Sequence, residues 1–138
     1  YGKPIYKFII DTDRFVAMST YLKEHNITLC SNTYEYVLDK LKKGDFVYLD
    51  PPYDRVSTTS FTSYSKYDFT QADQHRLRLA CDKLNERGVK FMLSNAPTDF
   101  IVEEFKDYHQ SFVSASRIVN SKVEGRGKVK EIIVRNYK

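Results

Sequence analysis

Short apolar runs alternate with helix-patterned segments along this chain, and no other feature constrains its fold as much. The predicted strands are residues 27–30, 46–50, 89–95, 111–119 and 128–137, and the predicted helices are residues 11–26, 31–44, 70–88 and 98–106. This order is typical of an α/β fold around a mainly parallel sheet, because each crossover between parallel strands needs a helix. The last two strands follow one another directly, so we expect the sheet to end in an antiparallel β-hairpin.

Local signals mark where the predicted helices begin and end. Thr70 and Asp73 have the spacing of a capping box, and Gly88 can adopt the left-handed conformation that closes a helix. Gly44 has the same role for the second helix, whose predicted cap is Asn32. Apolar side chains at spacings of three and four are expected to face a core, and in the first helix they are Phe15, Met18 and Leu22.

The composition is that of a single globular domain. Hydrophobic residues make up 41% of the 138 residues and charged residues 29%, and no apolar run reaches the roughly 18 to 20 residues that span a bilayer. We therefore expect a cytoplasmic protein without membrane contact. Cys30 and Cys81 lack the close Cys/His spacing of a zinc site, so we predict two buried thiols and no metal. His25, His75 and His109 are far apart in the sequence and are predicted to be structural or exposed.

The predicted strand 46–50 is apolar nearly throughout, which indicates burial, and it leads into Asp50-Pro51-Pro52-Tyr53. In parallel α/β sheets, ligands bind at the carboxyl ends of strands, where this tetrad falls. Proline has a fixed φ and no N–H, so the backbone after Asp50 is stiff. The Asp50 carboxylate and the Pro51 carbonyl form an acceptor pair that suits the two N–H donors of an exocyclic amino group, and Tyr53 adds a flat face. A planar base that carries an amino group would satisfy all three features.

Four ordered blocks of the chain then resemble the Dam-like (D12 class) DNA adenine-N6 methyltransferases. They read "DFVYLDPPYD", "SFTSYSKYDFTQADQHRL", "GVKFMLSN" and "NSKVEGRGKVKEIIVRNY". The resemblance extends over nearly the whole chain. A lone DPPY tetrad also serves methyltransferases that act on other nitrogens, but the four blocks in this order are much more specific.

The resemblance implies transfer of a methyl group from S-adenosylmethionine to N6 of an adenine that is flipped out of DNA. It assigns Asp50 and the carbonyl of Pro51 to hold the amino group, with Pro52 completing the rigid turn. Tyr53 is implied to stack on the ring. Asn95 ends a predicted strand on the same side as Asp50, so it either shapes this site or caps a turn.

The cofactor side matches the family only in part. The family's acidic-aromatic pair corresponds to Thr33 and Tyr34, and Asp50 is the third predicted cofactor contact. Tyr34 can still stack, whereas threonine lacks the family's carboxylate. The family's glycine-rich turn has no counterpart among the five glycines. Residues 1–138 are therefore expected to form the carboxyl-terminal part of a methyltransferase catalytic domain, with an incomplete Rossmann-like sheet and without the amino-terminal cofactor motif and most of the target recognition segment.

Double-stranded DNA is the predicted partner, and the net charge of +4 is compatible with it. Positive and hydroxyl-bearing side chains suit phosphate contacts. The predicted DNA contacts are Lys3, Ser57, Ser60, Thr62, Tyr64, Arg126 and Lys128. A plain surface loop at 55–67 and a solvated hairpin at 120–130 are the alternatives.

An incomplete sheet has consequences for association. Open strand edges carry unpaired N–H and C=O groups, so we expect the chain to pair with a complementary amino-terminal half or with itself. Two other functions remain open at this point. The chain could be a non-catalytic remnant or nucleic-acid-binding fragment of such an enzyme, or it could belong to an RNA adenine-N6 methyltransferase.

Overall fold

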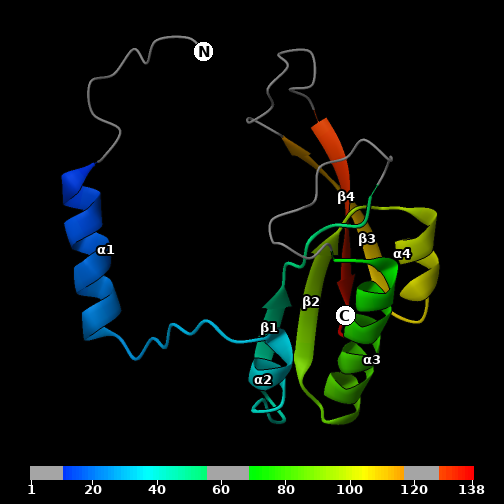
Figure 1. Cartoon of the computed structure of the whole chain (residues 1–138), viewed down its shortest axis with the longest axis horizontal. Coiled ribbons are helices and arrows are strands. Elements are labelled where there is room, and N and C mark those ends of the chain that lie inside the picture. Colours follow the sequence, from blue (N-terminus) through cyan, green and yellow to red (C-terminus); the bar gives the residue numbers. More distant parts are fainter. Residues whose placement is uncertain (1–10, 56–68, 117–127) are drawn as a thin grey trace. The chain divides into compact units, whose positions relative to one another are not determined.

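The computed structural model describes residues 11–55, 69–116 and 128–138, and Figure 1 shows the arrangement of their helices and strands. The chain divides into two compact units, Tyr1–Asn32 and Thr33–Lys138. Each is described by itself.

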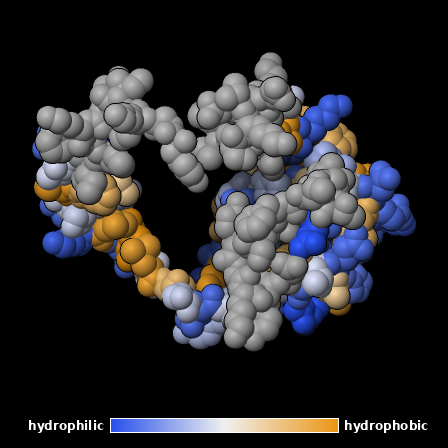
Figure 2. Space-filling view, turned by 45° about the horizontal axis from the view of Figure 1, so that its top comes forward, coloured by the Kyte–Doolittle hydropathy of each residue, from blue (hydrophilic) through white to orange (hydrophobic). Residues whose placement is uncertain are grey.

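The first unit contains helix α1, Thr12–Glu24. The Asp11 side chain caps it by accepting a hydrogen bond from the backbone N–H of Arg14 at 3.2 Å, so the predicted helix is confirmed. Its apolar stripe was predicted to face a core, but no residue of α1 is buried. Hydrophobic side chains of this unit are exposed at its surface, where Figure 2 shows them in orange.

The predicted strand at 27–30 is wrong, because these residues form no strand. Leu29 is 76% exposed, and a strand needs a neighbour to satisfy its backbone N–H and C=O groups. The prediction of two buried thiols is wrong for one of the two cysteines. Cys30 is exposed, whereas Cys81 is buried as expected.

The second unit is built on a four-stranded sheet with strand order β1-β2-β4-β3. The strands are β1 (Phe46–Leu49), β2 (Lys90–Asn95), β3 (His109–Ser116) and β4 (Lys128–Arg135). Strands β1 and β2 are parallel, whereas β4 is antiparallel to both β2 and β3. The α/β prediction is thus confirmed, but the expected mainly parallel sheet is mixed in the described residues. Strands β3 and β4 form the antiparallel pair that was expected, and residues 117–127 between them lie outside the described ranges.

Helix α3 (Gln71–Glu86) crosses over between the two parallel strands and begins with the predicted capping box. The backbone N–H of Thr70 donates to the Asp73 carboxylate at 2.7 Å, and the Asp73 N–H donates back to the Thr70 hydroxyl. Gly88 follows the helix with a φ of +70°, in the left-handed region that favours glycine. The core lies between the helices and the sheet, and it consists of Leu38, Leu49, Leu77, Cys81, Leu84, Val89, Phe91, Leu93, Ile101, Phe105, Ile132 and Val134. The shorter helix α4 (Asp99–Glu104) contributes Ile101.

Helix α2 spans only Tyr34–Leu38, much less than the predicted 31–44, and its cap is Thr33 instead of Asn32. The early end has a tertiary cause. The guanidinium of Arg87, at the end of α3, donates to the backbone carbonyls of Leu38, Asp39 and Leu41. These carbonyls therefore find a side-chain partner where a longer helix would need backbone N–H groups.

Strand β1 was predicted to be buried, and this prediction is wrong for half of its side chains. Phe46 is 54% exposed and Tyr48 is 53% exposed, although Leu49 is buried. In the described residues β1 is the edge of the sheet, with β2 as its one neighbour. The face that carries Phe46 and Tyr48 is therefore open to solvent, and the opposite face packs against helices.

Candidate functional site

The carboxyl ends of β1 and β2 lie side by side because the two strands are parallel, with Leu49 opposite Leu93. Asp50 directly follows β1, and Ser94 and Asn95 are the last two residues of β2. The sheet thus brings the predicted catalytic carboxylate next to two polar side chains of the neighbouring strand.

Two hydroxyl groups orient the carboxylate of Asp50. The Tyr48 hydroxyl donates to Ser94 Oγ at 2.9 Å, and Ser94 Oγ donates to Asp50 Oδ1 at 2.7 Å. Ser94 is buried, whereas Asp50 is exposed to a ligand. Hydrogen bonds to an ionised acceptor are shorter and stronger than those between neutral groups. One carboxylate oxygen of Asp50 is therefore held in place before any ligand arrives.

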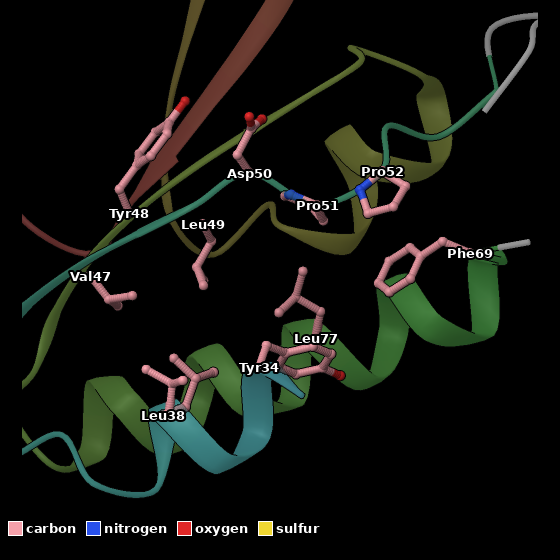
Figure 3. A pocket seen from close by; sticks show the side chains of 11 residues that line it. Tyr34, Leu38, Val47, Tyr48, Leu49, Asp50, Pro51, Pro52, Phe69 and Leu77 are labelled. Atoms are coloured by element: carbon pink, nitrogen blue, oxygen red, sulfur yellow. The ribbon is translucent and has the colours of Figure 1, made fainter. Parts of the chain in front are cut away.

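A pocket of about 390 Å³ opens beside the same strand end. Its lining comes from β1 with the residues that follow it, from α2 and from the start of α3: Tyr34, Val37, Leu38, Val47, Tyr48, Leu49, Asp50, Pro51, Pro52, Phe69 and Leu77. Figure 3 shows that Val47 and Leu49 point toward the helices, whereas Tyr48 and Asp50 point to the other side of the strand. The pocket consequently has an apolar interior, and the Asp50 carboxylate is directed to the other side of β1 (Figure 3).

The backbone after Asp50 is fixed by side chains from α3 and β2. Gln74 Nε2 donates to the carbonyl of Pro52 at 2.8 Å, and the backbone N–H of Asp54 donates to Asn95 Oδ1 at 2.9 Å. Asn95 Nδ2 donates to Gln74 Oε1 at 3.0 Å, which joins the two amides. The Thr98 hydroxyl also donates to the Asp54 carboxylate at 2.6 Å. The rigid turn that the prolines predicted is thus anchored to the core at both ends.

Tyr53 is half-buried, and its hydroxyl lies 3.4 Å from a carboxylate oxygen of Glu131 on β4. Burial raises the pKa of the Tyr53 hydroxyl, and the nearby carboxylates of Glu131 and Asp50 raise it further, against an opposing hydrogen bond with Ser94. The phenol therefore stays neutral at physiological pH and offers an uncharged ring.

Tyr34 lines the pocket as predicted, and burial is the main reason that its pKa rises to about 12. Thr33 caps α2 without a side-chain hydrogen bond to the helix backbone and does not line the pocket. Its hydroxyl instead bonds to Glu35, which was not singled out from the sequence. The pKa of Glu35 is lowered by its own backbone N–H first, and hydrogen bonds from Tyr34 and Thr33 add to this effect. The acid of this region therefore follows the aromatic residue, two positions later than in the family pattern.

The structure places the predicted site residues unequally. Asp50, Pro51, Pro52 and Tyr34 share one pocket, and Tyr53 follows directly. Of the predicted DNA contacts, Lys128 is the first residue of β4. The others lie outside the described residues, namely Lys3, Ser57, Ser60, Thr62, Tyr64 and Arg126.

None of the three histidines lines the pocket. His75 pairs with Glu104 at 2.6 Å, His25 bonds to the carbonyl of Tyr21, and His109 is exposed at the start of β3. Among the described residues, no group of three or more acidic, histidine or cysteine side chains could hold a metal ion. None of the helices in the described ranges is long and apolar enough to cross a membrane.

Sequence reasoning missed two polar residues that shape the site, Gln74 and Ser94. Both carried a signal. Gln74 occupies a helical position three residues before Leu77 on the inward stripe of α3, where an apolar residue is expected. Ser94 interrupts the apolar run of β2 immediately before Asn95. A polar residue at a core position needs a buried partner, and here the partners belong to the site.

Comparison with known proteins gives a consistent result. The sequence model of the D12 class N6 adenine-specific DNA methyltransferases matches residues 1–121. The chain is 39% identical over 138 residues to the type II methyltransferase M1.LlaDCHI of Lactococcus lactis subsp. cremoris, covering 99% of this chain and 49% of that protein. It is 36% identical to the type II methyltransferase M.MjaIII of Methanocaldococcus jannaschii, covering 99% of this chain and 48% of the relative. A DNA adenine methylase of Vibrio cholerae is 31% identical over 113 residues, 80% of this chain and 41% of that protein. The chain thus spans about half the length of the curated relatives that it matches.

Proposed function

This chain belongs to the D12 class of N6 adenine-specific DNA methyltransferases, and on that premise we propose that it supplies the base-binding part of an enzyme that methylates adenine N6 in double-stranded DNA. The observation that carries the proposal is the carboxylate of Asp50, held by Ser94 at the carboxyl end of β1 and followed by two prolines and a tyrosine. A base inside a duplex cannot reach such a group, so the target adenine must be flipped out.

The amino group of adenine is a poor nucleophile, because its lone pair is delocalised into the ring. Asp50 and the carbonyl of Pro51 accept hydrogen bonds from its two N–H groups and draw the nitrogen toward tetrahedral geometry. These bonds strengthen as positive charge develops on N6, so they stabilise the transition state more than the ground state. The N6–methyl bond forms as the sulfur–methyl bond breaks, and the excess proton then leaves to solvent. Tyr53, whose raised pKa keeps the phenol neutral over a still wider range of pH, stacks on the base.

S-adenosylmethionine is the proposed methyl donor, and it supplies an electrophilic methyl group carried on a sulfonium. The residues present fit part of this group. Tyr34, Phe69 and Pro51 offer flat or apolar surfaces to its adenine ring inside the pocket, and the negative charge of Asp50 next to the pocket suits the positive sulfonium. Thr33 remains a proposed contact from its place before Tyr34, although it does not line the pocket.

The remaining cofactor contacts are proposed to come from an amino-terminal portion of the catalytic domain. The chain covers about half of its relatives, and its sequence has no counterpart of the family's glycine-rich turn. An added strand beside β1 would satisfy the edge that is open in the described residues and would cover Phe46 and Tyr48. In this proposal the enzyme acts in the cytoplasm, and the predicted DNA contacts, with Lys3, Arg126 and Lys128 at phosphates, stand as proposals.

Asp50→Ala in the protein with its complete catalytic domain tests the proposal. Methyl incorporation should fall by about a hundredfold or more, because an interaction that strengthens in the transition state is lost. DNA affinity should change little, since it comes mainly from phosphate contacts. Asp107→Ala is the matched control, because Asp107 precedes β3 at the opposite end of the sheet from Asp50.

Both DNA and RNA duplexes should be offered to the wild-type protein. Methylation of RNA alone would assign the chain to an RNA adenine-N6 methyltransferase. Duplex binding without any methylation would identify a non-catalytic remnant. Activity of Asp50→Ala within roughly tenfold of wild type would remove Asp50 from its assigned role.

A further inference from the structure

Two buried side-chain amides, Gln74 on α3 and Asn95 at the end of β2, form a joined pair beneath the DPPY segment. Both residues are 0% exposed. Gln74 Oε1 accepts from Asn95 Nδ2 at 3.0 Å, so the two amides share one hydrogen bond and direct their remaining groups outward. Burying polar groups costs free energy unless every group finds a hydrogen-bond partner. The partners of the two amides therefore show which part of the chain the pair holds in place.

The outward groups reach the two peptide units that flank Tyr53. Gln74 Nε2 donates to the carbonyl of Pro52 at 2.8 Å, and this carbonyl belongs to the peptide unit before Tyr53. Asn95 Oδ1 accepts from the N–H of Asp54 at 2.9 Å, and this N–H belongs to the unit after Tyr53. Each peptide unit is planar and rigid.

Holding both planes leaves no backbone freedom at the tyrosine. Only the φ and ψ rotations of Tyr53 lie between the two units, and both are determined once the planes are fixed. The direction of its Cα–Cβ bond is then set, and the ring retains only its side-chain rotations. On the other side of the Pro52 carbonyl, the proline rings fix φ for Pro51 and Pro52.

We infer that Gln74 and Asn95 are positioning residues that aim the ring of Tyr53 at the target base. The pair occupies core positions where apolar side chains would pack at lower cost. Asn95 Oδ1 also accepts from the N–H of Ala96 at 2.8 Å, and the other two outward bonds reach the peptide units on either side of Tyr53. This inference rests on the proposed function, in which Tyr53 stacks on the flipped adenine. Neither amide touches the base or the cofactor.

A double-mutant cycle between Gln74 and Tyr53 tests the inference in the protein with its complete catalytic domain. Gln74→Met keeps the length of the side chain and removes both hydrogen bonds. It should lower kcat by about tenfold or more while KM for DNA changes by less than about twofold, because a misplaced contact group weakens the transition state. In a Tyr53→Ala background the same change should lower kcat by less than about twofold, since there is no ring left to aim.

Gln110→Met is the matched control. Gln110 Nε2 also donates to a backbone carbonyl, that of Val102, at 2.8 Å, but it lies on β3 outside the pocket. Its kcat should stay within about twofold of wild type. An equal loss from Gln74→Met in both Tyr53 backgrounds would overturn the inference, because Gln74 would then act independently of the ring. Gln74→Leu, a shorter apolar side chain that also lacks the Nε2 donor, replaces Gln74→Met should the latter fail to fold.

Hydrogen exchange separates this inference from the proposed function. Prolines have no N–H, so a peptide spanning residues 50–55 reports mainly on the amides of Tyr53, Asp54 and Arg55. Exchange in this peptide should be faster in Gln74→Met than in wild type and unchanged in Gln110→Met. A wild-type protein that methylates no DNA would refute the proposed function and leave this measurement intact. Unchanged exchange in Gln74→Met would refute the positioning role.

Discussion

The hydrogen bond from the Ser94 hydroxyl orients the Asp50 carboxylate. Deleting one oxygen atom, in Ser94→Ala, removes this hydrogen bond. In Ser94→Ala, Asp50 Oδ1 loses its donor at 2.7 Å and the Tyr48 hydroxyl loses its acceptor at 2.9 Å. We expect kcat of the complete enzyme to fall by about tenfold, because a carboxylate that rotates freely meets the amino group in a wrong geometry more often.

Single-turnover kinetics on a DNA duplex measure this effect without interference from product release. Ser111→Ala on β3 is the control, since it removes the same atom from a strand two positions away in the sheet. A Ser94→Ala enzyme as fast as the control would show that Asp50 is oriented by the substrate alone.

Helix α3 supplies both Gln74 and Leu77 to the site. The start of this helix therefore determines the positions of two site residues as well as the length of the helix. The Thr70–Asp73 capping box satisfies two backbone N–H groups that the helix cannot satisfy itself. Thr70→Ala should lower the free energy of unfolding by about 1 kcal/mol. Urea denaturation followed by circular dichroism measures the change. Asp99→Ala is the comparison, because Asp99 is an exposed acidic residue in the first turn of α4. An equal loss of unfolding free energy in Asp99→Ala would mean that the capping box contributes no more to stability than an exposed acidic residue.

For the helices and strands, the sequence was most informative where residues close together in the chain determine the structure. Helix α3 and strand β2 follow from the capping box, the apolar stripe and Gly88, which all lie within one short segment. The early end of α2 depends on Arg87, 49 residues after Leu38, so no local pattern reveals it. The exposure of Phe46 and Tyr48 depends on which strands lie beside β1, a property of the whole sheet.

The candidate site shows the same division. Asp50 through Tyr53 could be assigned from their order in the chain, because stiffness and hydrogen-bonding capacity are properties of those residues themselves. The bonds from Ser94 and Gln74 join segments 44 and 22 residues apart. Only the fold brings these partners together, and a sequence alone marks them as no more than polar residues in apolar surroundings.

At the scale of the whole molecule, the proposed function gives this chain one wall of a cofactor site, and β1 is an open edge of the sheet in the described residues. Expressed alone, the 138-residue chain should therefore methylate no DNA and bind S-adenosylmethionine weakly or not at all. It should also self-associate or pair with an amino-terminal portion of a related enzyme, because pairing satisfies the backbone groups along β1 and covers Phe46 and Tyr48. Light scattering and titration calorimetry measure these properties, and methyl transfer can be assayed after mixing with such an amino-terminal portion. A monomer that binds the cofactor at micromolar concentration would contradict the prediction.

Arg87 is not one of the residues that line the pocket, yet its hydrogen bonds to the carbonyls of Leu38, Asp39 and Leu41 hold the end of α2, the helix that carries Tyr34, Val37 and Leu38. In evolutionary terms, a substitution at position 87 can change the shape of the pocket without altering any residue in contact with a ligand. A lineage that replaced the arginine would have to lengthen α2 or find new donors for the carbonyls of Asp39 and Leu41, since that of Leu38 also accepts from the N–H of Leu41. We therefore expect substitutions at position 87 to be accompanied by changes within residues 34–41 during evolution.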